Sequence, residues 1–255
     1  LFESNRKEKQ QSKVNYEIWS NDRWSKVKRV IRHKTCKKIY RVNSHCGVVD
    51  VTEDHSLLNE KMEKIKPEEC IVGKTKLAHG FPLFNNSPVK LDELLDINEV
   101  IDKEAFLYGF FFGDGSCGHY DCKSGMKYSW ALNNQDLSLL EICKEFLFEL
   151  YGDNTNFKIL ETMSSSNVYK LVPKGSIKYM LNIFKKMYNY DRLKIVPDEI
   201  LNGDYYTKLD FFRGYYMADG DKCINSATKN INFSNKGKIG TAHLYYIVHS
   251  LGYNC

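Results

Sequence analysis

The pattern of hydrophobic and polar positions changes about a third of the way along the chain. The first 80 residues read as short strands separated by turns, and IYRVNSHCGVVDVT (39–52) alternates apolar and polar residues around a turn at 44–47. This alternation predicts a β-hairpin. Between about 81 and 103, two prolines, an Asn-Asn-Ser cluster and an acidic stretch indicate a domain boundary.

From residue 104 onward, helical and strand patterns alternate, which predicts an α+β unit. Helices are expected over EAFLYGFFFGDG (104–115), LSLLEICKEFLFELYG (137–152) and SIKYMLNIFKKMY (176–188). Strands are expected over KYSWAL (127–132), FKILETM (157–163) and NVYKLVP (167–173). The polar run at 133–136 supplies N-cap candidates for the second of these helices.

One element occurs twice. With a shift of 105 residues, FLYGFFFGDG (106–115) overlays FFRGYYMADG (211–220). The identical pairs are Phe106/Phe211, Gly109/Gly214, Asp114/Asp219 and Gly115/Gly220. A repeat at this spacing predicts a duplicated unit with pseudo-two-fold symmetry.

Each copy of the repeat carries small residues four positions apart, Gly109/Gly113 and Gly214/Ala218. On a helix these lie on one face, so they let a second backbone approach closely. The glycines after the acids, Gly115 and Gly220, are expected to end the helices in the left-handed conformation.

The acid that precedes each terminal glycine is the main candidate for chemistry. A carboxylate at a helix C-terminus opposes the helix dipole, which is unfavourable. If the two helices pack side by side in the same direction, Asp114 and Asp219 emerge together and repel unless a cation joins them. Hard oxygen ligands suit Mg²⁺. The alternative is a pair of core helices that end in Asp-Gly turns.

Composition and charge narrow the class of protein. Hydrophobic residues make up 42% and charged residues 27%, which suits a packed core. No apolar run is long enough to cross a bilayer, no secretory leader is visible, and eight cysteines without a CxxC pair favour reduced thiols inside a cell. Thirteen Lys or Arg against four acids give residues 1–41 a net charge of +9, which leaves −4 for the rest. The basic stripe at 26–41 fits either a phosphate backbone or a solvated strand face.

The repeated motif resembles that of the LAGLIDADG, or DOD-type, homing endonucleases. The resemblance implies that the motif helices form a central interface and that sheets beside them form a saddle over double-stranded DNA. It also implies that Asp114 and Asp219, with backbone near Gly113 and Ala218, bind the catalytic Mg²⁺. Lys194-Ile195-Val196-Pro197 is similar to the family's K-x-I/V-P block, so Lys194 would activate water or neutralise phosphate charge. An exposed lysine before a proline-started helix explains the same residues equally well.

VTEDHSLL (51–58) resembles the T-x-x-H block of inteins, although a turn or helix cap explains the same residues. The resemblance implies that Thr52 and His55 act on the N-terminal splice junction, and histidine suits this general acid–base task. The stretches IRHKTCKKIYRV, FFFGDGSCG and KYSWALNNQDL look like inteins of family-B DNA polymerases from large DNA viruses. The expected partners are therefore duplex DNA and the flanking exteins of a host polymerase.

These resemblances imply a fold class and domain order. A partial all-β Hint splicing domain is expected at 1–82, a linker at 83–103, and an α+β LAGLIDADG domain at 104–255. Within that domain, 104–192 would be the first pseudo-two-fold unit and 193–255 an incomplete second one. Leu1 is no splicing nucleophile and Tyr253 stands where a junction histidine is usual, so we expect truncation at both ends.

The function that this sequence predicts is an intein fragment that combines protein splicing with site-specific double-strand DNA cleavage. We expect a monomer without a membrane partner, located in the cytoplasm, nucleus or viral factory of a host cell. Two alternatives stay open: a free-standing or intron-encoded LAGLIDADG nuclease or maturase, and a catalytically inactive DNA-binding remnant.

Overall fold

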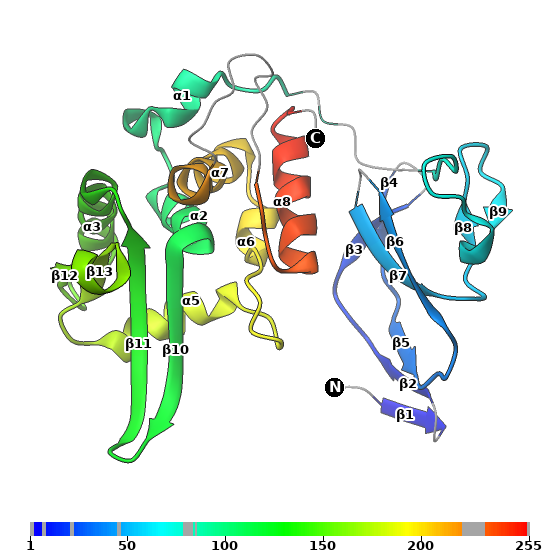
Figure 1. The fold of residues 1–255 in the computed structure, drawn as a ribbon, viewed down its shortest axis with the longest axis horizontal. Coiled ribbons are helices and arrows are strands. Elements are labelled where there is room, and N and C mark those ends of the chain that lie inside the picture. Colours follow the sequence, from blue (N-terminus) through cyan, green and yellow to red (C-terminus); the bar gives the residue numbers. More distant parts are fainter. Residues whose placement is uncertain are drawn as a thin grey trace. The chain divides into compact units, whose positions relative to one another are not determined.

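A computed structural model describes residues 3–6, 9–20, 23–44, 47–78, 84, 86–220 and 233–253. The chain divides into two compact units, Leu1–Phe84 and Asn85–Cys255, with mixed α and β content and small sheets (Figure 1). None of the helices within the described ranges is both long and apolar enough to span a bilayer.

The first unit contains short antiparallel strands and one 3-10 helix among its described residues. The strands are β1 (Glu3–Arg6), β2 (Lys9–Ser12), β3 (Glu17–Ser20), β4 (Arg23–Lys26), β5 (Val30–His33), β6 (Ile39–Ser44), β7 (Gly47–Thr52), β8 (Leu57–Leu58) and β9 (Lys64–Ile65), and the 3-10 helix is η1 (Pro67–Glu69). They pair as β1-β2-β5, β3-β4, β6-β7 and β8-β9. The pairing of Ser44 with Gly47 confirms the hairpin predicted at 39–52.

The first unit buries few side chains. Within its described part, Val51 and Pro67 are the buried residues. Ile18, Ile31 and Ile39 each expose more than half of their surface. These short strands therefore have little core of their own.

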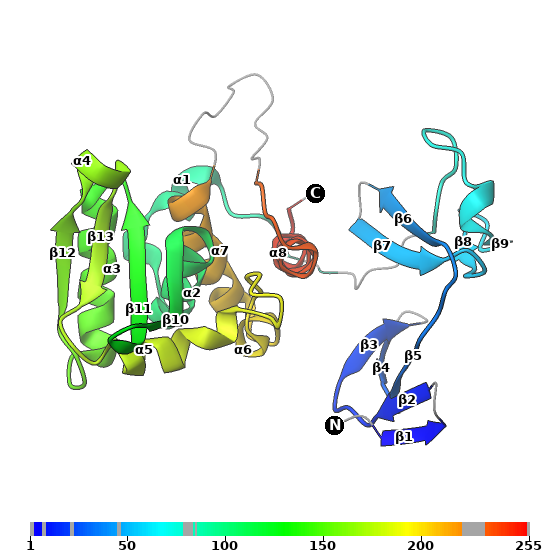
Figure 2. The same cartoon turned by 60° about the horizontal axis from the view of Figure 1, so that its bottom comes forward.

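The second unit combines a four-stranded antiparallel sheet with helices. Its strands are β10 (Gly115–Cys122), β11 (Gly125–Asn134), β12 (Phe157–Glu161) and β13 (Tyr169–Pro173), in the order β10-β11-β13-β12. Its helices are α1 (Leu91–Leu95), η2 (Ile97–Glu99), α2 (Lys103–Asp114), α3 (Leu137–Tyr151), α4 (Met163–Ser166), α5 (Ile177–Phe184), η3 (Lys185–Met187), α6 (Asp198–Leu201), α7 (Tyr205–Asp219) and α8 (Lys238–Ser250). Helices α3 and α5 pack against the sheet (Figure 2).

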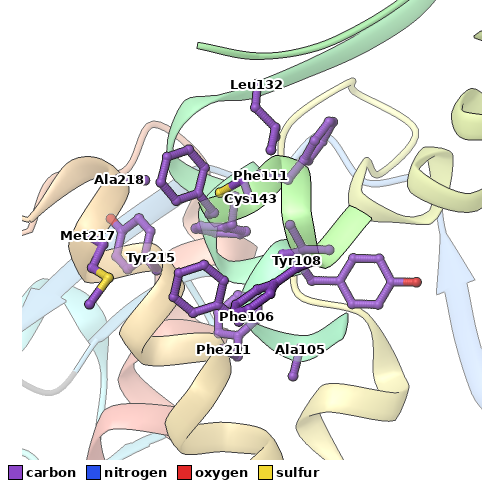
Figure 3. Close-up of a cluster of buried hydrophobic side chains, with 14 of the residues drawn as sticks. Ala105, Phe106, Tyr108, Phe111, Leu132, Cys143, Phe211, Tyr215, Met217 and Ala218 are labelled. Carbon is purple, nitrogen blue, oxygen red and sulfur yellow. The ribbon is translucent and has the colours of Figure 1, made fainter. Parts of the chain in front are cut away.

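The core of the second unit surrounds α2 and α7, the two helices that the repeat predicted. Every residue from 105 to 112 and from 209 to 218 is buried. Phe106 and Phe111 of α2 and Phe211 and Tyr215 of α7 belong to the aromatic cluster that Figure 3 shows. The helix pair is thus the centre of this unit.

One local expectation was confirmed and another was wrong. The N-cap of α3 is Asp136, a member of the polar run at 133–136, and its side chain accepts a hydrogen bond from Ser138 N. Gly115 and Gly220 end their helices with extended backbone, at φ −86° and −68°, not in the left-handed region. Glycine is needed at 115 for space, since a Cβ there would lie 2.2 Å from Phe111 Cδ2.

The segment predicted as a linker, 83–103, lies largely within the second unit. It holds α1 and η2, and its backbone carbonyls at Leu94 and Glu99 accept hydrogen bonds from Arg213 of α7. The buried Arg213 side chain, which is far away in sequence, therefore satisfies backbone carbonyls of a segment that the sequence pattern had indicated as a boundary.

Candidate functional site

The glycines of the repeat bring the backbones of α2 and α7 into direct contact. A Cβ added to Gly109 would lie 1.9 Å from Phe211 O, and one added to Gly214 would lie 2.0 Å from Phe106 O. The two contacts are reciprocal, because the shift of 105 residues converts one into the other. The small-residue faces predicted from the sequence are therefore the faces that meet.

The two helices run in the same direction and end together. At their N-terminal ends, Thr207 Oγ1 of α7 donates to Asp102 Oδ2 beside α2, at 3.0 Å. At their C-terminal ends, a Cβ on Gly113 would lie 3.0 Å from Asp219 Cβ. Asp114 and Asp219 therefore emerge from the same end of the helix pair.

Asp114 is held by two asparagines from the end of β11. Asn134 Nδ2 donates to Asp114 Oδ2 at 2.6 Å, and Asn133 Nδ2 donates to the Asp114 carbonyl at 2.9 Å. Asn134 is itself buried, and its Oδ1 accepts from Asp136 N at 2.8 Å, which fixes the amide so that its donor faces the acid. The sequence interpretation assigned these asparagines to a helix cap and missed this role.

Lys194 closes the C-terminal end of α2. Its Nζ donates to the carbonyls of Phe111, Phe112 and Gly113, at 3.0, 3.0 and 2.8 Å. Phe111 O also accepts from Gly115 N, whereas the carbonyls of Phe112 and Gly113 belong to the last turn, which an α-helix leaves without an internal partner. Burial lowers the pKa of Lys194 to about 8, while the charges of Asp114 and Asp219 act in the opposite direction. The structure thus brings Lys194 together with both acids.

Asp219 has a different setting from Asp114. Its side chain keeps an exposed surface, yet desolvation by the surrounding protein raises its pKa above the ordinary value, and Lys194 opposes this rise. Asp114 is half-buried, with an asparagine on one carboxyl oxygen. The sequence repeat is symmetric here, but the two carboxylates do not have the same surroundings.

The donor set suits a cation that retains water. Within the described residues, no group of three or more His, Cys, Asp or Glu side chains could enclose a metal ion. Two carboxylates at one helix-pair end nonetheless fit Mg²⁺, which binds through one or two carboxylates and completes its shell with water and substrate phosphates. The carbonyl of Gly113 already accepts from Lys194, so the carboxylates are the better ligands.

The chain is similar to short parts of larger known proteins. No family model matches the chain. It is 51% identical, over 98% of its length, to part of a DNA polymerase of Acanthamoeba polyphaga mimivirus. It is 25% identical, over 88% of its length, to part of the replication factor C small subunit of Methanocaldococcus jannaschii. The chain spans only 14% and 13% of these two relatives.

Similar segments thus form small parts of two proteins with different names, which is the relation expected of an inserted element. The resemblance to an endonuclease-bearing intein is confirmed. Among solved structures, a mesophilic variant of the homing endonuclease I-DmoI aligns with a TM-score of 0.44 and 18% identity, over 59% of this chain and 76% of that one.

The residues that resemble the intein block T-x-x-H lie in the first unit, at the end of β7. His55 N donates to the Thr52 carbonyl at 2.9 Å, which closes a turn. The Thr52 hydroxyl donates to Asp54 Oδ1 at 2.7 Å, and Asp54 pairs with Lys37. The His55 side chain is exposed. The turn brings the two predicted residues close in space but does not join their side chains.

Proposed function

We propose that the second unit is a LAGLIDADG-type endonuclease that cuts both strands of duplex DNA with Mg²⁺ held by Asp114 and Asp219. The observation that carries this proposal is the emergence of both acids, together with Lys194, at one end of a parallel helix pair. When bound, the cation would activate water and stabilise the leaving oxygen of a phosphodiester. A single chain holds both motif helices, which supports action as a monomer.

The protein side chains have distinct parts in this chemistry. Asn134 holds Asp114 in one orientation through its fixed amide. Lys194 places a positive charge near both acids and, in its protonated form, would stabilise charge on a phosphate. Preorganised groups of this kind favour the transition state because they need not reorient during the reaction.

The sheet of the second unit supplies a face for DNA. Since successive strand residues point to opposite faces, Lys127, Lys158 and Lys170 share the face opposite buried Trp130 and Leu171. None of the paired strand residues on that face is Asp or Glu. A face with three lysines and no acids suits phosphate contacts, and antiparallel strands can enter the major groove.

The domain assignment completes this proposal. The strands of the first unit support a partial all-β Hint splicing domain at 1–82, in which Thr52 and His55 act on the N-terminal junction with host-polymerase exteins. The reciprocal contacts of Gly109 and Gly214 support a pseudo-two-fold axis between α2 and α7. On this basis 104–192 is the first endonuclease unit and 193–255 begins the second.

Cleavage of duplex DNA that carries the uninterrupted host-gene sequence tests the nuclease. Asp114→Asn and Asp219→Asn should each lower the cleavage rate by about 10²-fold or more while DNA binding persists, since the amide cannot serve as an anionic ligand. Asp153→Asn removes an exposed acid beyond α3 and is the matched control. Undiminished cutting by either site variant overturns the assignment. If the wild-type protein binds this DNA but does not cut it, the protein is a catalytically inactive DNA-binding remnant.

Splicing needs a separate test in a precursor with host sequence on both sides. A His55→Ala precursor should accumulate with its N-terminal junction intact, because the general acid–base group is lost. His33→Ala, which removes an exposed histidine of β5, is the control and should splice normally. Normal splicing by the His55 variant would exclude this histidine from the reaction.

A further inference from the structure

A buried polar cluster lies at the opposite end of the helix pair from the acids. Asp210 and Arg213 of α7 are only 1% and 2% exposed. The shift of 105 residues places Ala105 and Tyr108 at the matching positions of the first repeat copy. The repeated motif therefore does not account for a charged pair at this place.

The Arg213 side chain donates hydrogen bonds to the segment before α2. Its Nε donates to Leu94 O at 3.0 Å, Nη1 to Glu99 O at 3.2 Å and Nη2 to Glu93 O at 3.2 Å. Nη1 also forms an ion pair with Asp210. The guanidinium is thus neutralised and bonded on all three of its nitrogens, as a buried charge requires.

Asp210 and Thr207 extend the cluster to the start of α2. Asp210 Oδ2 accepts from Ile101 N at 2.9 Å and from Asp102 N at 2.7 Å. Asp102 is the N-cap of α2, because its Oδ1 accepts from Ala105 N at 2.9 Å. Its other oxygen accepts from Thr207 Oγ1 at 3.0 Å. One side chain therefore caps α2 and binds α7 at the same time.

We propose that Asp102, Thr207, Asp210 and Arg213 are positioning residues that set the axial register of α2 against α7, and through it the relative placement of Asp114 and Asp219. The glycine contacts bring the backbones together, but apolar packing is non-directional and permits small slides. Hydrogen bonds are directional, so the cluster selects one register. A helix of 12 residues is about 18 Å long and transmits a displacement to its far end.

The catalytic consequence of this inference rests on the proposed nuclease function, whereas the structural consequence does not. Misplacement of catalytic groups by about 1 Å can cost 10²-fold in rate. The rate of DNA cleavage should therefore fall when the cluster is broken, although none of its members touches Asp114 or Asp219. Local protection from hydrogen exchange at the acid end should fall as well, whether or not the protein cuts DNA.

Arg213→Met and Thr207→Val test the proposal in the full chain. Thr207→Val removes only the bond between helices and leaves no buried charge, so it is the variant expected to fold if Arg213→Met does not. Lys144→Met is the control, because Lys144 also forms an i,i+3 ion pair, with Glu141, but on an exposed face of α3. All variants are compared at a temperature at which circular dichroism shows them folded.

The readouts are kcat for duplex cleavage, Kd for DNA, and amide exchange at Gly115 and Gly220, whose N–H groups bond to Phe111 O and Tyr216 O. We expect kcat to fall by about 10²-fold in Arg213→Met and less in Thr207→Val, with unchanged Kd, faster exchange at both glycines and an unaffected control. Wild-type kcat and unchanged exchange in a folded variant overturn the proposal. If the wild-type protein cuts no DNA, the proposed function fails and the exchange result alone decides the register.

Discussion

Lys194 resolves an electrostatic conflict that the sequence repeat creates. A carboxylate at a helix C-terminus faces the negative end of the helix dipole, and here two such carboxylates end side by side. The Lys194 ammonium lies on the last carbonyls of α2 and near both acids, so it offsets the dipole and the repulsion together. Its position explains how two unfavourable placements are tolerated in one protein.

The pKa of Lys194 predicts a pH dependence of stability. It is lowered by burial to about 8 in the folded protein, from an ordinary value of 10.5. Between these two pH values the unfolded chain holds the proton and the folded protein does not, so this residue makes the folded state more stable as pH rises. The free energy of unfolding of the wild type, minus that of Lys194→Met, should therefore increase from pH 8 to pH 10.5 in denaturant titrations.

A matched variant separates this effect from general alkaline behaviour. Lys174→Met removes an exposed lysine in the turn before α5. The wild type minus this variant should give a difference that stays flat across the same pH range. A flat difference for Lys194→Met as well would contradict the buried, shifted lysine.

Asn134 shows where sequence reasoning about the site ends. Asp114 and Asp219 could be found because a repeated motif marks them, and Lys194 because a short block resembles a family pattern. Asn134 reaches Asp114 only because β10 and β11 pair with Gly115 opposite Leu132. That register depends on a hairpin with no strong turn signal. The sequence analysis therefore assigned Asn134 to the helix cap instead.

At the scale of elements, the helix interface is where the pattern was most informative. Small residues four apart predicted a close contact, and the structure places backbone carbonyls against both central glycines. Helices α2, α3, α5 and α7 and strands β11, β12 and β13 were also predicted, whereas β10 and α8 were not. The short α1 was missed because five residues give too little pattern, and Arg213, far away in sequence, fixes that region.

Gly109→Ala tests the interface directly. The added methyl would lie 1.9 Å from Phe211 O, so the helices must separate. Overpacking costs about 1–3 kcal/mol or more, which exceeds the gain of about 1 kcal/mol in helix propensity from Gly to Ala. We expect a lower free energy of unfolding in urea titrations, and slower DNA cleavage because the acids move apart.

The control for this substitution is Gly237→Ala at the start of α8. The nearest atom to a Cβ there is Leu193 Cβ at 3.3 Å, and φ is −94°, so the methyl is tolerated with a small adjustment. Gly237 is the N-cap of α8, where alanine is a poorer residue than glycine, so its unfolding free energy should fall, but by less than that of the Gly109 variant. Equal stability of the Gly109 variant and the wild type would mean that the helices do not meet at this glycine.

At the scale of the whole molecule, the two units differ in how many apolar side chains they bury. The second unit contains a continuous buried cluster around α2 and α7, drawn from helices and sheet alike. The first unit buries Val51 and Pro67 within its described part and leaves several large apolar side chains exposed. The sequence predicted a boundary between the units from its prolines and polar residues, but average composition could not reveal this unequal burial.

This inequality predicts different behaviour when the units are expressed separately, as residues 1–84 and 85–255. Apolar burial is the main favourable term in folding, and it must offset about 1–2 kcal/mol of backbone entropy for each ordered residue. The second fragment, which keeps its core, should unfold in one cooperative thermal transition close to that of the intact chain. The first has too little buried surface to offset its entropy and should show no cooperative transition by circular dichroism or calorimetry. A sharp transition in the isolated first fragment would show that its strands are stable without further partners.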